Sequence, residues 1–313
     1  MPPDGGAPGG AGRGAGGVLF VHAHPDDEAV SSGGLIARLV DAGVRVDLVT
    51  CTDGAEGEIH DPELDAAEAQ PRLAEIRAAE LACALDALGG GAVRHHKLGY
   101  RDSGMMGTAA NEHPDSLWKA DLNRATERLV SIVRAARPSA IVTYDENGNY
   151  GHPDHINANR IAAAAFDAVA DVDRFYEIAF AREPWMRLME DMKARGIPLP
   201  WGQGEDASPS SDAGDAASVV DAADAAPDAA PSTEEQAEWG TPEALVTTRI
   251  EVVGWLDRKR RCMECHRTQR QDMGWLLELP EDLALRALGT EHFVLRQRRS
   301  SPIPEGYRED WVL

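Results

Sequence analysis

Cysteine and long apolar runs are both scarce in this sequence. Only four of its 313 residues are cysteine, and no window holds the 18 or more apolar residues that a membrane-spanning helix requires. The first 17 residues are rich in glycine and lack the apolar core of a secretory signal peptide. We therefore predict a disordered lead-in over residues 1–17, a cytoplasmic protein without a membrane partner, and reduced cysteine thiols.

Positive charge is the second deficit. The chain carries 31 Lys and Arg against 53 Asp and Glu, which gives a formal net charge of −22 at pH 7. This excess of negative charge argues against nucleic acid and anionic membranes as partners. The imbalance is greatest over residues 203–238, which contain ten acidic residues and no Lys or Arg. We predict a disordered acidic insert there, with an acidic docking segment as the alternative.

The chain does contain a regular alternation of strand-like and helix-like segments. Strands are expected over 18–21, 44–50, 93–98, 140–144, 245–253 and 292–295, and helices over 33–40, 73–88, 122–136, 155–170, 256–271 and 280–288. This order predicts an α/β fold, a Rossmann-like, doubly wound and mostly parallel sheet with helices on both faces. We expect a catalytic domain over 18–202 and a smaller C-terminal α+β extension over 239–313 that completes the same domain.

Two polar clusters each follow a predicted strand. The first contains His24, Asp26 and Asp27, and the second contains His152 and His155. Because ligands bind at the carboxyl edge of such sheets, we expect the two clusters to form one site. Catalytic zinc usually has three ligands from His, Asp or Glu and one position open to water. We predict one zinc ion per subunit, bound by His24, Asp27 and His155.

The remaining two residues of these clusters suit acid–base chemistry. Asp26 lies between two predicted ligands and can accept a proton from water as general base. His152 can stabilise a developing oxyanion or protonate a leaving amine. The structural alternative is that the histidines are ordinary loop residues and that Asp26 and Asp154 cap helices. Two such clusters at strand ends favour the metal site.

The pairing of Ala23-His24-Pro25-Asp26-Asp27-Glu28 with His152-Pro153-Asp154-His155 resembles the PIG-L/LmbE-like zinc-dependent N-deacetylases, and within them the actinobacterial mycothiol enzymes. The resemblance implies a Rossmann-like fold, the ligands and base named above, and four further substrate-site residues. It implies that Glu58, Arg77 and Asp102 hold sugar or inositol hydroxyls and that Tyr150 lies on a mobile loop over the site. Arg77 as a surface charge and Tyr150 as a packed aromatic are the structural alternatives.

The resemblance also implies a reaction, removal of an acetyl group from the amine of a small amino-sugar linked to inositol. The alternatives are amidase action on a larger mycothiol conjugate and deacetylation of another N-acetyl amino-sugar. Ser31 stands where the family's amidases tend to carry Lys and favours the smaller substrate, whereas residues 143–147 and 246–249 lean toward the amidase. A non-catalytic nucleotide-binding module is disfavoured because no Gly-x-Gly-x-x-Gly follows the first strand. Zinc or iron as the cellular metal, and a homo-oligomer, stay open.

One motif remains outside this scheme. Residues 262–266 fit the Cys-x-x-Cys-His pattern of c-type haem attachment. They lie in a charged helical stretch and no export signal precedes them, so we do not expect haem. The resemblance instead implies that 266–269 match a His-x-Thr-Gln element and that the cysteines are incidental. His266 is then either an active-site residue or a helix-packing residue.

Overall fold

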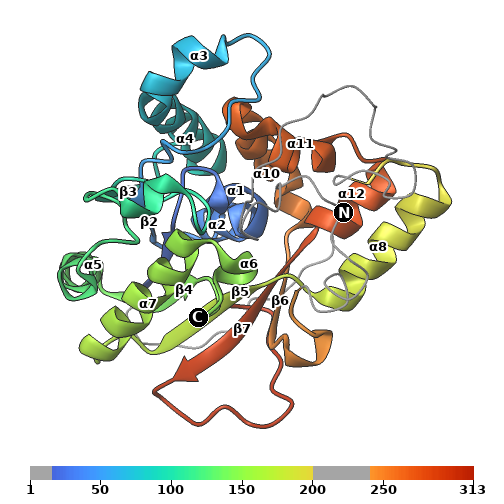
Figure 1. Cartoon of the computed structure of the whole chain (residues 1–313). Coiled ribbons are helices and arrows are strands. Elements are labelled where there is room, and N and C mark those ends of the chain that lie inside the picture. The colour runs from blue at the N-terminus through green and yellow to red at the C-terminus, as the bar shows by residue number, and fades with distance from the viewer. Residues whose placement is uncertain (1–15, 200–239) are drawn as a thin grey trace, which may run out of the picture.

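The computed structural model describes residues 16–199 and 240–313, and within these ranges seven strands form one sheet. Figure 1 shows the sheet running through the molecule with helices packed around it. The strands are β1 (Gly17–His22), β2 (Val46–Thr52), β3 (Val93–Tyr100), β4 (Pro138–Thr143), β5 (Arg174–Ala179), β6 (Thr248–Glu251) and β7 (Thr290–Arg298). The predicted disordered insert over 203–238 lies outside the described residues, as does the predicted lead-in except for Gly16 and Gly17, and Gly17 begins β1.

The strand order, β3-β2-β1-β4-β5-β7-β6, confirms the predicted fold class. Strands β1 to β5 are parallel, and β7 and β6 join antiparallel at one edge. Every residue of β1 and β2 is buried, as expected for central parallel strands with helices on both faces. The chain winds outward in opposite directions from β1 and β4, so the switch point between them is the expected ligand site.

Two groups of helices cover the sheet. Helices α2, α4 and α10 contact one another on one face, and α5 and α7 pack together on the other. The helices are α1 (Asp27–Ser31), α2 (Gly33–Asp41), α3 (Ala66–Ala69), α4 (Leu73–Gly89), α5 (Leu122–Ala136), α6 (Gly148–Gly151), α7 (Pro153–Ala168), α8 (Arg182–Ala194), α10 (Leu256–Cys265), α11 (Arg270–Leu277) and α12 (Glu281–Leu288). The C-terminal helix α10 therefore packs against helices from the first third of the chain.

Several secondary-structure elements were missed or were predicted with the wrong bounds. Strand β5 and helix α8 were not predicted, because β5 mixes charged and apolar residues and Pro184 interrupts the pattern of α8 near its start. The predicted helix over 256–271 ends at Cys265, since the backbone of His266 leaves the helical region (φ −85°, ψ 64°). The predicted strand over 245–253 shortens to β6, between two 3-10 turns.

A buried ion pair connects the C-terminal segment to the helix that follows the first motif. The carboxylate of Glu291 on β7 accepts hydrogen bonds from the backbone N–H groups of Gly34 and Leu35, both at 2.8 Å, and from Nζ of Lys259 at 2.7 Å. Gly34 also lets the next segment approach, because a Cβ there would lie 2.5 Å from Cβ of Val252. These contacts fix α2, α10 and β7 relative to one another.

The prediction of four reduced thiols is wrong for this structure. Cys83 on α4 and Cys265 at the end of α10 form a disulfide, whereas Cys51 and Cys262 are free and buried. The two bonded cysteines are 182 residues apart, so only the packing of α10 on α4 brings them together. Because Cys265 is bonded, the Cys-x-x-Cys-His pattern has no free pair of cysteines for haem.

The disulfide should contribute measurably to stability. We expect Cys83→Ser to lower the free energy of unfolding by about 2–4 kcal/mol, since the bond restricts the unfolded chain. Thiol titration in denaturant should find two reactive thiols before reduction and four after it. Four thiols without reductant would show that the bond does not form.

A buried glutamate on β5 should make stability depend on pH. Burial raises the pKa of Glu177 to about 7, with Arg296 opposing the shift and two nearby acidic residues adding to it. Because the folded-state pKa lies above the unfolded one, the stabilising contribution is complete below about pH 4.5 and is lost as pH rises through about 7. Glu177→Gln should therefore gain stability relative to wild type between pH 5 and 8, on the order of 1 kcal/mol after allowance for solvent screening. Chemical unfolding of both proteins at pH 5 and at pH 8 tests this. The control is Glu251→Gln, at an exposed site on β6, which should show no such gain.

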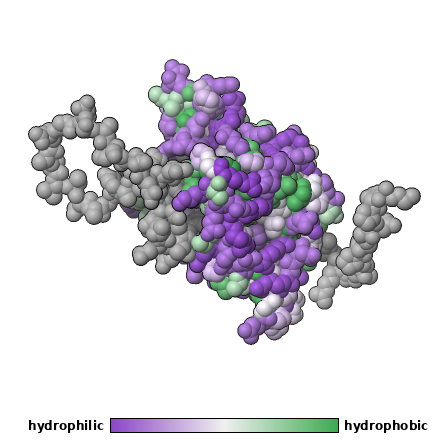
Figure 2. All heavy atoms as spheres, turned by 90° about the vertical axis from the view of Figure 1, so that its right-hand side faces the viewer, coloured by the Kyte–Doolittle hydropathy of each residue, from purple (hydrophilic) through white to green (hydrophobic). Residues whose placement is uncertain are grey.

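The surface agrees with the charge of the chain. The face seen in Figure 2 is predominantly hydrophilic, with hydrophobic residues scattered over the described part. Among residues 16–199 and 240–313, no helix is both long and apolar enough to cross a membrane.

Candidate metal centre

The polar residues named from the sequence converge at the carboxyl edge of the sheet. His24 follows β1, Asp102 follows β3, and Tyr144 follows β4. From the other side, α7 begins beside the same point and carries His155. The two histidine motifs are 130 residues apart in the chain and are within hydrogen-bond distance in the fold, where Nε2 of His24 lies 3.3 Å from Oδ2 of Asp154.

Three side chains form a triangle of possible metal-binding atoms. Nδ1 of His24 lies 3.4 Å from Oδ2 of Asp27 and 3.2 Å from Nε2 of His155. Nε2 of His155 lies 3.3 Å from Oδ1 of Asp27. Two ligands of a tetrahedral zinc ion, each about 2.0–2.1 Å from the metal, lie about 3.3–3.4 Å apart. The spacing and the chemistry of this donor set fit one zinc ion.

The charge balance of the triangle also suits a cation. Burial alone would raise the pKa of Asp27, but the imidazoles of His155 and His24 hold that pKa well below its usual range. Burial likewise disfavours a charged His24, but Asp102, Asp154 and Asp27 raise the pKa of His24 well above its usual value. Carboxylates thus attract positive charge to this point, and a divalent ion would supply it without protonating the histidine.

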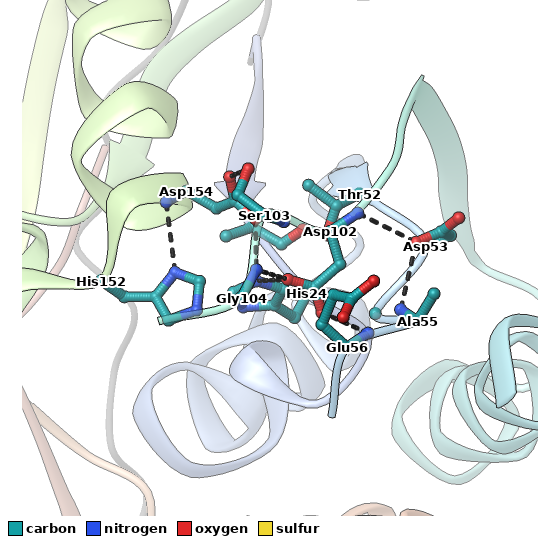
Figure 3. Close-up of polar contacts among 12 residues, drawn as sticks. His24, Thr52, Asp53, Ala55, Glu56, Asp102, Ser103, Gly104, His152 and Asp154 are labelled. Carbon is teal, nitrogen blue, oxygen red and sulfur yellow. Dashed lines mark hydrogen bonds and ion pairs between the residues drawn. The ribbon is translucent and has the colours of Figure 1, made fainter. Parts of the chain in front are cut away.

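The far nitrogen of His24 is held by carboxylates. Its Nε2 lies 3.3 Å from Oδ2 of Asp154 and 3.5 Å from Oδ1 of Asp102, as Figure 3 shows. Asp154 is itself fixed by Ser103, whose backbone N–H donates to it at 2.8 Å and whose hydroxyl also donates to it. A carboxylate on the far nitrogen fixes the ring orientation and leaves Nδ1 free to bind metal. Asp154 therefore does not act as a helix cap.

Tyr144 supports the other side of the triangle. Its hydroxyl donates to Oδ2 of Asp27 at 2.7 Å and accepts the backbone N–H of Ala23 at the same distance. Its ring stacks on the imidazole of His155, with centroids 4.0 Å apart. The sequence analysis used Tyr144 only as the end of a strand and as part of residues 143–147, and Asp154 only as part of the second motif, with capping as the alternative. Neither supporting role was predicted, and the one signal for Asp154 was its position within that motif.

Asp26 has an unusual backbone conformation. Its φ is 143°, a region that residues other than glycine rarely adopt and that costs about 1–3 kcal/mol. Its side chain makes no capping bond to α1, which contradicts the capping interpretation. Nη2 of Arg77 instead donates to Oδ2 at 2.9 Å. Burial raises the pKa of Asp26 to about 7, with Arg77 opposing and Asp27 adding to the shift.

His152 lies beside the triangle at the start of α7. Its Nδ1 accepts the backbone N–H of Asp154 at 3.1 Å, so its ring caps the helix. Its ring centroid lies 4.5 Å from that of His24 and 5.1 Å from that of His155. Burial and these two neighbouring imidazoles lower the pKa of His152 to about 2. The three imidazoles also offer nitrogen atoms within 4.8 Å of one another, so His152 is the nearest candidate for a further ligand.

Two of the predicted substrate-binding residues are buried in supporting contacts. Asp102 is 3% exposed and accepts backbone N–H groups from Gly104 at 2.9 Å and Glu56 at 3.2 Å. Arg77 is 2% exposed and donates to the carbonyls of Pro25 and Gly54 as well as to Asp26. Both side chains therefore shape the loops around the centre in this structure.

The other three predicted substrate-binding residues are more open. The side chain of Glu58 is 74% exposed and lies 3.1 Å from Nε2 of His60. Tyr150 is 53% exposed on α6, and its ring centroid is 4.9 Å from that of His155. The hydroxyl of Ser31 donates to the carbonyl of Asp27 at 2.8 Å. Ser31 also lines a surface cavity between α8, α12 and the β5–β7 edge, whose lining contains none of the three predicted ligands.

Fold and site together define this chain as an α/β protein with a candidate metal centre at the switch point of its sheet. The family model described as PIG-L, GlcNAc-PI de-N-acetylase, matches residues 19–166. The "1D-myo-inositol 2-acetamido-2-deoxy-alpha-D-glucopyranoside deacetylase" of Acidothermus cellulolyticus is 39% identical over 94% of this chain and 93% of its own length. The protein of the same name from Thermobifida fusca is 38% identical over 94% of this chain and 97% of its own. The chain belongs to the PIG-L family, as the two histidine motifs predicted.

Solved structures support the fold. The N,N'-diacetylchitobiose deacetylase of Pyrococcus horikoshii has a TM-score of 0.52 at 18% identity, covering 91% of this chain and 85% of that one. GalB, the 4-carboxy-2-hydroxymuconate hydratase of Pseudomonas putida, has a TM-score of 0.55 at 15% identity, covering 92% and 98%. Because a hydratase and a deacetylase share this fold, the reaction has to be argued from the site.

Proposed function

We propose that this chain is a zinc-dependent deacetylase of 1D-myo-inositol 2-acetamido-2-deoxy-α-D-glucopyranoside, which it hydrolyses to acetate and the free amine. The observation that carries the proposal is the triangle of His24, Asp27 and His155, whose atoms are spaced as ligands of one tetrahedral ion. The name and the near full-length similarity of the relatives support the substrate. A small-molecule substrate also agrees with the strongly acidic chain.

In this proposal zinc, when bound, supplies a Lewis acid that polarises the amide carbonyl and lowers the pKa of water. Asp26 is the general base. Arg77 engages only Oδ2 of Asp26, which leaves Oδ1 to accept the proton of the attacking water. Once protonated, the same carboxyl group can return its proton to the leaving amine.

His152 is better suited to the oxyanion than to the amine. Its Nδ1 accepts a backbone N–H, so in the neutral ring the proton lies on Nε2. The lowered pKa keeps the imidazole neutral at pH 7. A neutral Nε2–H donates a hydrogen bond to negative charge that develops on the carbonyl oxygen, whereas it is a weak source of a proton.

The second candidate is an amidase that acts on a larger thioether conjugate of the same amino-sugar. Ser31, which argued against it, donates its hydroxyl to the carbonyl of Asp27 and lines a cavity whose lining contains none of the three predicted ligands, so this residue is a weaker discriminator than its place in the sequence suggested. We therefore compare kcat/KM for N-acetylglucosaminyl-inositol and for a mycothiol bimane-type conjugate. We expect the higher kcat/KM for N-acetylglucosaminyl-inositol, measured as acetate release. A higher kcat/KM for the conjugate would assign the protein to the amidases.

A further inference from the structure

Among the described residues, a second buried cluster lies behind the metal centre and has no part in the chemistry above. It consists of Glu28, Cys262 and His266, whose ligand-type atoms lie within 4.8 Å of one another. Glu28 and His266 are fully buried, as is Cys262. A buried carboxylate is costly unless it has a partner, so the contacts of Glu28 indicate what the cluster does.

The geometry of this cluster fits a direct hydrogen bond better than a shared metal ion. Oε1 of Glu28 lies 2.6 Å from Nε2 of His266. Two ligands of one zinc ion lie about 3.3 Å apart, the separation found in the triangle. The shorter distance is that of a direct charge-assisted hydrogen bond between imidazole and carboxylate.

The other oxygen of Glu28 reaches the proposed base. Oε2 accepts the backbone N–H of Asp26 at 3.1 Å, at the residue whose φ is 143°. Glu28 therefore joins His266, from the C-terminal part of the chain, to the strained backbone of Asp26. Arg77 holds the side chain of Asp26, and Glu28 holds its main chain.

His266 is itself held in a rigid frame. Thr268, two residues on, donates its backbone N–H and its hydroxyl to the carboxylate of Glu80 on α4, at 2.8 and 2.6 Å. Cys265, one residue before, is bonded to Cys83 on the same helix. Arg77 also lies on α4. The same helix therefore positions both the side chain that binds Asp26 and the segment that carries His266.

We propose that Glu28 and His266 are positioning residues, a pair through which the C-terminal segment holds Asp26 in its strained, reactive conformation. The proposal rests on the proposed function, since it assumes that Asp26 is the base. Both side chains are fully buried, and Glu28 contacts the backbone of Asp26, so the pair acts on kcat through Asp26. A displacement of about 1 Å in a reacting group can cost 10²-fold in rate.

The test compares two amides at position 266. In His266→Gln the side-chain nitrogen can reach the place of Nε2, whereas His266→Asn is one methylene too short. We expect His266→Asn to lower kcat for N-acetylglucosaminyl-inositol by about 10- to 100-fold, with KM within about twofold and metal content unchanged. His266→Gln should recover most of the loss. Equal kcat values for the two variants would overturn the proposal.

Two further variants separate positioning from packing. Cys262→Ala removes a buried thiol that donates only a long, weak hydrogen bond to Oε1 of Glu28, at 3.9 Å, and should keep kcat near wild type. A loss as large as that of His266→Asn would overturn the proposal, because the hydrogen bond between His266 and Glu28 would then not be the contact that matters. In an Asp26→Asn background, His266→Asn should cause no further loss, because the two act through one group. If the double variant lost a further 10- to 100-fold in kcat, the proposal would be overturned. Normal kcat in Asp26→Asn alone would instead overturn the assignment of Asp26 as the base.

Discussion

Replacing Asp26 by Asn should lower kcat by about 10²–10⁴-fold and leave the metal in place. The amide oxygen can still accept the hydrogen bond from Arg77, but it cannot accept a proton from water. Steady-state kinetics and metal analysis of the same preparation check both parts of the prediction. Glu146→Gln removes an exposed carboxylate from the loop after β4 and should keep full activity.

The pH profile gives a second readout for Asp26. The pKa of Asp26 is about 7 in the metal-free chain, and a nearby cation lowers it because it favours the carboxylate. In the wild type, kcat/KM should therefore rise with pH and level off at or below about pH 7. That acidic limb should be absent from Asp26→Asn. An unchanged limb with near-normal kcat would place the base elsewhere.

His155→Ala should abolish tight metal binding. Its Nε2 forms two edges of the triangle, at 3.2 Å from His24 and 3.3 Å from Asp27, so the variant keeps only two of the three predicted ligands. Loss of a group that merely orients a ligand already costs about 10- to 100-fold in metal affinity, and loss of a ligand should cost more. We expect one divalent ion per wild-type chain, zinc as isolated.

Metal analysis after dialysis measures this directly. His95→Ala is the matched control, because His95 bonds Thr50 on the neighbouring strand and lies outside the triangle. It should retain the full metal content. Undiminished metal in His155→Ala would rule out the ligand assignment, and would turn attention to His152, the third imidazole of the cluster.

The parallel sheet and the candidate ligands could both be predicted from the sequence, for the same reason. A central parallel strand is a continuous apolar run, and the polar residues after it must lie at the carboxyl edge of the sheet. His24 and Asp27 after β1, and His155 after β4, follow that rule. Segments that mix charged and apolar residues, such as β5, or that carry a proline near the start, such as α8, do not show this pattern and were missed.

Residues that act through distant partners could not be found in this way. Arg77 was predicted to bind substrate, and its pairing with Asp26, 51 residues away, was not predicted. Asp154 was considered only as a possible helix cap, in the structural alternative, and it lies against His24. Nothing in the local pattern around either residue identifies its partner, because the packing of the helices on the sheet determines which distant residues meet.

The sequence by itself therefore determined the family, the order of strands and helices at the centre of the chain, and the candidate metal ligands. These depend on hydrophobic periodicity and on short motifs, which act over a few residues. Only the tertiary structure decided that Cys83 bonds Cys265, that Glu28 joins His266 to Asp26, and that Ser31 donates to the carbonyl of Asp27. The first two of these depend on packing between segments far apart in the chain, such as α10 on α4. Hydrophobic packing is non-directional, so an apolar pattern shows that a helix is buried but not which segment it packs against.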